Sequence, residues 1–254
     1  MSPAAKIEQQ AASYGFRQAQ ITSNSFLLTI FINNTLCHHN TLHVYLAGDG
    51  QPWWRHRQVA IDPTPSHLLA FDLMRVDNAS TVYLGRPCYH GQYQAEACHP
   101  LYWTHWRYSA TVVNSMASGL IQLLSAYPAC RITLIGYSGG GTLAMLIAPK
   151  LAAVERVVTI AGNLDVTAWA DYHDYSALDG SLNPATEPAL PATIAQIHLI
   201  GNEDNNIPAE ISLSALKRQS DPVILRFPNA DHDCCWVDIW PTVLNCFEVG
   251  CGPN

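Results

Sequence analysis

The chain has 254 residues, of which 48% are hydrophobic and only 13% are charged. This composition is typical of a folded globular protein and excludes a largely disordered chain. The net charge of −7 and the lack of a basic run argue against nucleic acid and anionic membrane surfaces as partners. No apolar stretch is long enough to span a bilayer. The length predicts one domain over residues 1–254.

Residues 1–12 are polar and rich in alanine, and they lack the basic and apolar pattern of an export signal. We expect a flexible lead-in there. After residue 12, apolar runs alternate with short segments of turn-forming residues. Two apolar runs joined by a turn at residues 22–24 predict a hairpin within residues 14–33.

Buried-type strands are predicted next, over residues 41–46, 81–84, 132–135, 156–161, 195–200 and 222–227. Helices are predicted between them, over residues 63–76 with Ser66 as a cap, 109–127, 142–148 and about 209–218, and a last one starts near Cys235. Such alternation predicts an α/β fold whose mainly parallel central sheet carries helices on both faces. Residues 85–108 and 162–192 look irregular, and residues 163–185 are expected to form part of the rim of a site with a small cap or none.

Eight cysteines, an even number, favour an oxidising compartment, and thus a periplasmic or secreted protein. Reduced thiols in a cytoplasmic enzyme are the alternative. Cys88 and Cys98 bracket one short segment that a disulfide could close, and Cys246 and Cys251 bracket another. The cysteine and histidine spacing fits no zinc-site pattern, so no metal is expected.

One serine lies in a setting suited to nucleophilic chemistry. The segment Gly136-Tyr137-Ser138-Gly139-Gly140 follows the apolar run 132–135 and precedes a helix. Glycines on both sides permit a sharp turn, and the helix N-terminus favours negative charge. Strand, glycine-walled serine and helix together give the context that the G-x-S-x-G motif requires.

A nucleophilic serine needs a base, and the base needs an acid that orients it. His232 follows the last predicted strand, and Asp204 follows the strand before it. Because parallel strands end at the same edge of a sheet, we expect both side chains near Ser138. Asp165, after the strand 156–161, is the rival acid.

These segments resemble the α/β-hydrolase family over nearly the whole chain. The resemblance rests on G-Y-S-G-G at 136–140, G-N-E-D-N-N-I-P at 201–208 and A-D-H-D-C-C-W at 230–236. The segments Y-L-A-G-D-G-Q-P-W (45–53), G-Y-S-G-G-G and H-D-C-C-W also resemble a bacterial branch of esterase-like proteins. Many proteins of that branch are exported, which agrees with the cysteine content.

The resemblance implies a role for each residue. Ser138 would attack an acyl carbonyl, His232 would move the proton, and Asp204 would orient the imidazole. The oxyanion would be held by the backbone N–H groups of Gly139 and Asp49, with Gly50 as the alternative to Asp49. The loop has Ala47-Gly48 where the family has His-Gly, a change that leaves a backbone donor intact.

The predicted protein is therefore a serine hydrolase that cleaves esters or thioesters of small molecules, as a monomer and without a cofactor. Trp53, Trp54 and Tyr137 are candidates for the substrate pocket, although the two tryptophans could equally be packing residues. A peptidase or acyltransferase with the same three residues is one alternative. A non-catalytic binding protein that retains the fold is another.

Overall fold

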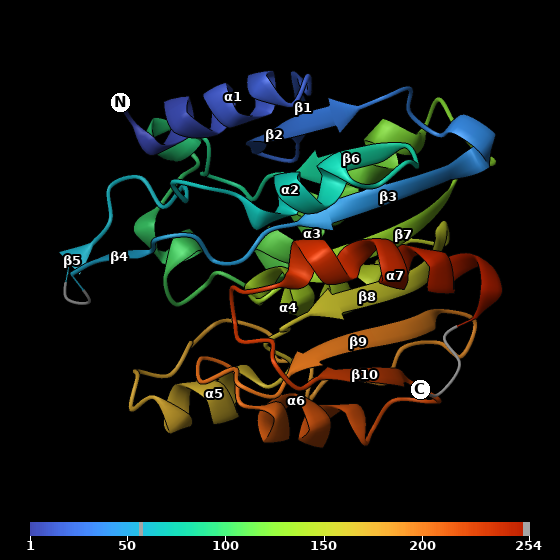
Figure 1. The fold of residues 1–254 in the computed structure, drawn as a ribbon. Coiled ribbons are helices and arrows are strands. Elements are labelled where there is room, and N and C mark those ends of the chain that lie inside the picture. The colour runs from blue at the N-terminus through green and yellow to red at the C-terminus, as the bar shows by residue number, and fades with distance from the viewer. Residues whose placement is uncertain (56–57, 251–254) are drawn as a thin grey trace.

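The computed structural model describes residues 1–55 and 58–250, and a central sheet organises it (Figure 1). Its eight strands lie in the order β1-β2-β6-β3-β7-β8-β9-β10. β1 and β2 form the predicted antiparallel hairpin, β2 also pairs antiparallel with β6, and the strands from β6 to β10 are parallel. The mainly parallel sheet is thereby confirmed. The strands span Arg17–Ser23 (β1), Phe26–Asn33 (β2), Thr41–Leu46 (β3), Thr81–Leu84 (β6), Arg131–Tyr137 (β7), Val154–Ile160 (β8), Ala195–Gly201 (β9) and Val223–Phe227 (β10).

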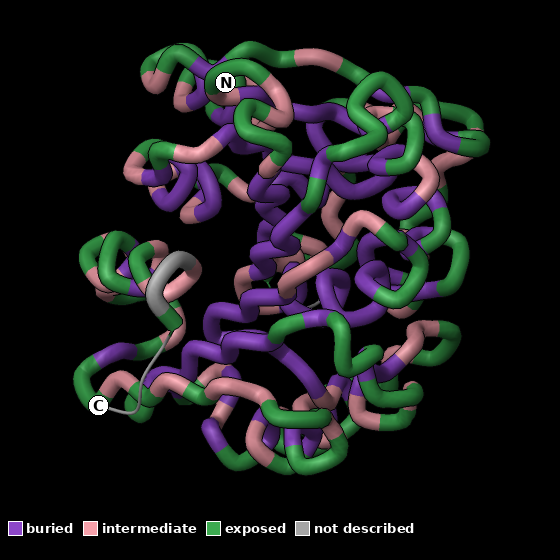
Figure 2. Tube along the Cα trace, turned by 90° about the vertical axis from the view of Figure 1, so that its right-hand side faces the viewer, coloured by how far each residue is buried: buried purple, intermediate pink, exposed green. Residues whose placement is uncertain are grey.

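Helices cover both faces of the sheet, as the alternation predicts. Successive residues of a strand face opposite sides, so Leu134 packs with α3 and α4 while Ile135 packs with α2 and α7. The buried segments in Figure 2 follow the sheet and the facing sides of the helices. No described helix is long and apolar enough to cross a membrane. The helices span Pro3–Ser13 (α1), Leu69–Arg75 (α2), Ala110–Leu124 (α3), Gly139–Ile147 (α4), Val166–Tyr172 (α5), Ala209–Leu216 (α6) and Trp236–Val249 (α7).

The N-terminal residues form helix α1 where the composition suggests a flexible lead-in. Ser2 caps the helix by accepting a hydrogen bond from the Ala5 amide, and Pro3 occupies the first turn. Both are standard helix-start signals. Ile7 and Ala11 are buried against the sheet side of α2, which explains why the segment is ordered.

The helix expected over residues 63–76 begins only at Leu69, and Ser66 does not cap it. Pro65 disfavours helical geometry at Thr64. The amide of Thr64 instead donates to Asp62, and its hydroxyl accepts a hydrogen bond from the His90 amide. The bond with His90 ties the segment to the loop after β6.

Two excursions lie at the edge where the parallel strands end. The first is a small hairpin of β4 (Trp53–Trp54) and β5 (Gln58–Val59), and the second is the long connection that contains α5. Figure 1 shows both on the side toward which the arrowheads of β3, β8 and β9 point. The sheet edge that carries the predicted site therefore has walls from two separate parts of the chain.

The structure pairs six cysteines. Cys88 pairs with Cys98, as their spacing suggests, while Cys37 pairs with Cys130 and Cys234 with Cys235. The sequence spacing did not predict the last two pairs, because Cys37 and Cys130 approach only when β3 and β7 become neighbours. Cys251 lies outside the described residues, so its suggested pairing with Cys246 is not described.

The two non-adjacent disulfides are expected to differ in their effect on stability. Cys37–Cys130 closes a loop of 93 residues and Cys88–Cys98 a loop of 10. Loop entropy predicts losses of about 4.5 and about 2.5 kcal/mol in the free energy of unfolding when each pair is replaced by alanines. Urea unfolding of the two double variants measures the difference, and equal losses would contradict the loop-length account.

Candidate active site

Ser138 lies at the turn between β7 and α4 in a backbone conformation unusual for a residue with a side chain. Its φ and ψ are 53° and −121°. Its amide donates to the Ile160 carbonyl, and its carbonyl accepts hydrogen bonds from the amides of Gly141 and Asn163. Residues held in such conformations persist where the surrounding structure fixes them, and they concentrate at functional sites.

Glycine is required on both sides of this turn. A Cβ at Gly136 would overlap the Gly140 backbone, and a Cβ at Gly140 would overlap the Leu46 carbonyl at the end of β3. The glycines therefore let α4 start close to the end of β3, with the serine at the tip.

The structure brings the side chains of Ser138, His232 and Asp204 into one hydrogen-bonded chain. His232 Nε2 is 3.0 Å from Ser138 Oγ, and His232 Nδ1 is 2.9 Å from Asp204 Oδ2. When Nδ1 donates to the carboxylate, Nε2 is left as the acceptor for the serine hydroxyl. The arrangement can thus withdraw a proton from Ser138 and stabilise the imidazolium that results.

Asp204 is fixed by its own loop. Its second carboxylate oxygen accepts hydrogen bonds from the amides of Asn206 and Ile207, at 2.9 and 2.7 Å, and its side chain is 1% exposed. The rival acid, Asp165, caps helix α5 by accepting from the Ala168 amide and also binds Asn183. The structure therefore brings Asp204, and not Asp165, to His232.

Two hydrogen bonds hold the loop that carries His232, one at His232 itself and one at the next residue. The Trp236 indole donates to the His232 carbonyl at 2.9 Å. Tyr137 donates its hydroxyl to Asp233 at 2.7 Å, and its ring centre lies 5.2 Å from that of His232. Burial, together with the hydrogen bond to Asp233, raises the pKa of Tyr137 well above its ordinary value, so the phenol stays protonated as a donor.

These residues face a cleft of about 990 Å³, within the size range of small-molecule sites. Its lining contains Ser138, His232 and all three candidate pocket residues, Trp53, Trp54 and Tyr137. Trp53 is 36% exposed and Trp54 is 56% exposed, because both project from the β4–β5 hairpin. The α5 excursion supplies the facing residues Trp169 and Tyr175.

Gly139 and Asp49, the predicted oxyanion donors, both line the cleft. Gly139 is the first residue of α4, and Asp49 lies on the loop after β3. A Cβ at Gly48 would be 3.3 Å from Ser138 Cβ, so the loop after β3 runs directly beside the serine. In the part of the chain that the structure describes, the amides of Gly139 and Asp49 donate to no protein group. Both are available to an oxygen atom of a ligand.

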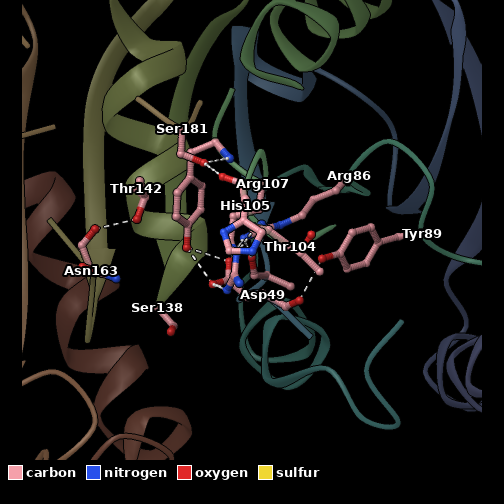
Figure 3. A network of polar contacts seen from close by, with 12 residues as sticks. Asp49, Arg86, Tyr89, Thr104, His105, Arg107, Ser138, Thr142, Asn163 and Ser181 are labelled. Carbon is pink, nitrogen blue, oxygen red and sulfur yellow. Dashed lines mark hydrogen bonds and ion pairs between the residues drawn. The ribbon is translucent and has the colours of Figure 1, made fainter. Parts of the chain in front are cut away.

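The sequence analysis did not identify several polar residues of the site. Figure 3 shows Arg86 and Arg107 converging on the Asp49 carboxylate. Asn163 lines the cleft beside Ser138 and is 2% exposed, and its side-chain oxygen has no hydrogen-bond partner among the described residues. Asn163 follows β8, so the strand-end rule used for Asp204 could have identified it. The arginines come from the irregular segment 85–108, where no pattern marks them.

Burial alone would raise the pKa of the Asp49 carboxyl group. The charges of Arg86 and Arg107 outweigh that effect and hold the pKa below its ordinary value. Asp49 is therefore ionised at neutral pH. Among residues 1–55 and 58–250, no group of three or more histidine, cysteine, aspartate or glutamate side chains is arranged to hold a metal ion.

No protein-family model and no curated protein sequence matches the chain. Solved structures do match it in fold. An esterase of Pyrococcus furiosus aligns with a TM-score of 0.64 at 13% identity, covering 98% of this chain and 92% of its own. A protein of unknown function from Agrobacterium tumefaciens, classed as an α/β hydrolase, aligns with a TM-score of 0.58 at 14% identity, over 91% of this chain and 95% of its own.

A third similar structure is an acylaminoacyl peptidase of Pyrococcus horikoshii, with a TM-score of 0.62 at 13% identity. It covers 92% of this chain, but only 41% of the peptidase is aligned. The chain therefore has the α/β-hydrolase fold, as its resemblance implied. At these identities the likeness concerns the fold, and function has to be argued from the site.

The assignment of the acid gives a direct test. Replacing Asp204 with asparagine is expected to lower kcat by about 10⁴-fold, because the amide favours the wrong imidazole tautomer. Asp165→Asn is the matched control and is expected to retain turnover. Steady-state kinetics of both variants with one activated ester measure the effect. Intact turnover in Asp204→Asn with loss in Asp165→Asn would show that the acid is misassigned.

Proposed function

We propose that the protein is a serine hydrolase that cleaves carboxylic ester or thioester bonds through an acyl-enzyme on Ser138. The observation that carries the proposal is the continuous hydrogen-bonded chain from Ser138 Oγ through His232 to Asp204, of which Ser138 and His232 line the cleft. Nucleophile, base and acid follow one another in the chain order expected for the α/β-hydrolase fold.

Acylation begins when Ser138 Oγ attacks the carbonyl carbon of the substrate. The hydroxyl proton passes to His232 Nε2, and the carbonyl π electrons move to the oxygen, forming a tetrahedral oxyanion. When this intermediate collapses, the bond to the leaving oxygen or sulfur breaks and His232 returns the proton to that atom. The alcohol or thiol departs, and the acyl group remains on Ser138.

Deacylation repeats these steps with water as the nucleophile. His232 Nε2 takes a proton from the water, whose oxygen attacks the acyl carbon, and the proton then returns to Ser138 Oγ as the acid is released. Asp204 orients the imidazole and stabilises the imidazolium in both halves of the reaction. The amides of Gly139 and Asp49 hold the oxyanion each time it forms.

The three cysteine pairs support an oxidising compartment, and we infer a periplasmic or secreted location for the working enzyme. The size and the aromatic walls of the cleft support a small-molecule acyl substrate. These two inferences are independent of each other, since one rests on thiol chemistry and the other on the shape of the site.

A fluorophosphonate probe tests the nucleophile. We expect stoichiometric labelling of the wild-type protein and none of Ser138→Ala, because phosphonylation requires an activated serine. Ser176, an exposed serine that lines the same cleft, provides the matched control, and Ser176→Ala should label fully. A folded wild-type protein that is not labelled, or equal labelling of Ser138→Ala, would refute the proposal.

A panel of p-nitrophenyl esters of increasing acyl length tests the role of the tryptophans. If Trp53 contacts the acyl chain, Trp53→Ala should raise KM for long chains by about 5- to 10-fold and leave the acetate almost unchanged. Tyr127, 37% exposed and distant from the cleft lining, is the control for loss of an exposed aromatic ring. A uniform change across the panel would mean that Trp53 packs against the fold only. Matching p-nitroanilides in the same assay distinguish peptidase activity.

A further inference from the structure

A buried ionic cluster lies beside the nucleophile. The Asp49 carboxylate is 2.9 Å from Arg86 Nη2 and 2.8 Å from Arg107 Nη1, and it accepts a hydrogen bond of 2.7 Å from the Tyr108 hydroxyl. The side chains of Arg86 and Arg107 are 4% and 5% exposed, and Tyr108 is fully buried. We call these four residues the Asp49 cluster, of which Figure 3 labels Asp49, Arg86 and Arg107.

The cluster also holds the backbone of the loop after β3. Arg86 Nη2 donates to the Ala47 carbonyl at 3.2 Å, and the Tyr89 hydroxyl donates to the Asp49 carbonyl at 2.8 Å. Arg107 Nε donates to the Thr104 carbonyl, which fixes the guanidinium itself. The loop is therefore bound at its carboxylate and at two carbonyls, which leaves little freedom for the Asp49 amide between them.

The carboxylate lies against the first residue of α4. A Cβ at Gly139 would overlap both Asp49 Oδ1 and the Tyr108 hydroxyl. The Asp49 cluster thus touches Gly139, the residue that supplies the other proposed oxyanion donor. The cluster therefore contacts both segments that carry the two proposed donors.

The charges of the cluster do not cancel. One carboxylate between two guanidinium groups leaves a formal surplus of one positive charge, buried where charge interactions are weakly screened. A lone carboxylate at this position would oppose a developing oxyanion, and the two arginines reverse that effect. Buried ion clusters of this kind are weak evidence for a role in stability.

We propose that the Asp49 carboxylate, bound by Arg86 and Arg107, positions the oxyanion site by fixing its own amide opposite that of Gly139, while the two arginines offset the negative charge of that carboxylate. Asp49 thereby acts through its backbone amide as a donor and through its side chain as a positioning group. This inference rests on the proposed function, because it assumes that an oxyanion forms on a substrate attacked by Ser138.

Asp49→Asn tests the positioning role, because asparagine keeps the shape of the side chain and loses the charge that binds Arg86 and Arg107. The positive charge left on the two arginines would by itself favour an oxyanion, so a fall in kcat reports lost positioning. We expect kcat for p-nitrophenyl acetate to fall by about 10²-fold, with KM changed by less than about threefold. The interaction is made in the transition state, so binding of the ground-state ester should be affected much less.

The decisive measurement is a pair of substrates, an oxygen ester and the thionoester in which sulfur replaces the carbonyl oxygen. Sulfur is a weak hydrogen-bond acceptor, so an intact oxyanion site favours the oxygen ester. We expect this preference, measured as a ratio of kcat/KM values, to fall by about tenfold in Asp49→Asn. Loss of folded molecules would lower both rates equally and leave the ratio unchanged.

Asp77→Asn is the matched control. Asp77 is a second buried carboxylate, bonded to His43 and Tyr45 on β3 and absent from the cleft lining. It should lower stability without changing the ratio. An unchanged ratio in folded Asp49→Asn would overturn the proposal.

If Asp49→Asn does not fold, Arg107→Met and Arg107→Lys replace it in the same assay. Methionine removes the charge and lysine retains it, so the ratio should fall in the first and recover in part in the second. The same ratio as wild type in both variants would overturn the proposal.

The outcome separates this inference from the proposed function. If labelling and turnover depend on Ser138 but the ratio of kcat/KM values for the two esters is unchanged in Asp49→Asn, only the positioning role is refuted. Turnover that survives Ser138→Ala would remove both.

Discussion

The carbonyl oxygen of Leu46 lies where a side chain on Gly140 would have to be, and this contact between the end of β3 and the first turn of α4 organises the whole site. Because the two elements approach so closely, Ser138 must occupy a sharp turn, with its amide bonded to the Ile160 carbonyl. The loop that continues β3 is forced to run alongside the serine. Nucleophile and oxyanion loop are consequently parts of one packing arrangement, and a change in either would displace the other.

The loop that carries the general base, His232, follows a strand at the edge of the sheet. β10 is an edge strand whose residues alternate between partly buried and exposed, so the sheet alone fixes the following loop weakly. Contacts from outside the strand supply the order that it lacks. Trp236 binds the carbonyl of His232, and Tyr137 binds the neighbouring Asp233. Tyr137 adjoins Ser138, so the same turn that presents the nucleophile also steadies the loop of the base.

Sequence reasoning succeeded where one local rule decides the structure. The alternation of strands and helices was enough to predict the sheet, and the rule that parallel strands end at one edge was enough to expect Asp204 and His232 near Ser138. It failed where the partner comes from irregular backbone. Nothing near Arg86 or Arg107 in the sequence indicates that both bind one carboxylate, because segment 85–108 has no periodicity from which to infer its path. Asp49 was accordingly predicted for its backbone amide, and the environment of its side chain was not foreseen.

The remaining misses follow from tertiary contacts that override local preference. Residues 63–68 do not join the helix predicted over 63–76, because Pro65 disfavours helical geometry at Thr64 and the bond between Thr64 and His90 ties the segment to the loop after β6. The pairing of Cys37 with Cys130 likewise depends on β3 and β7 becoming neighbours, which sequence spacing does not reveal.

The disulfide between Cys88 and Cys98 lies on the segment that joins Arg86 to Arg107. It bypasses a loop of 10 residues and so shortens the covalent route between the two guanidinium groups. A shorter tether raises the effective concentration of the second arginine once the first has reached the carboxylate. Oxidation of this pair would therefore make the closing of both arginines on Asp49 more cooperative, and would couple the electrostatics of the site to the redox state of a bond that takes no part in the chemistry.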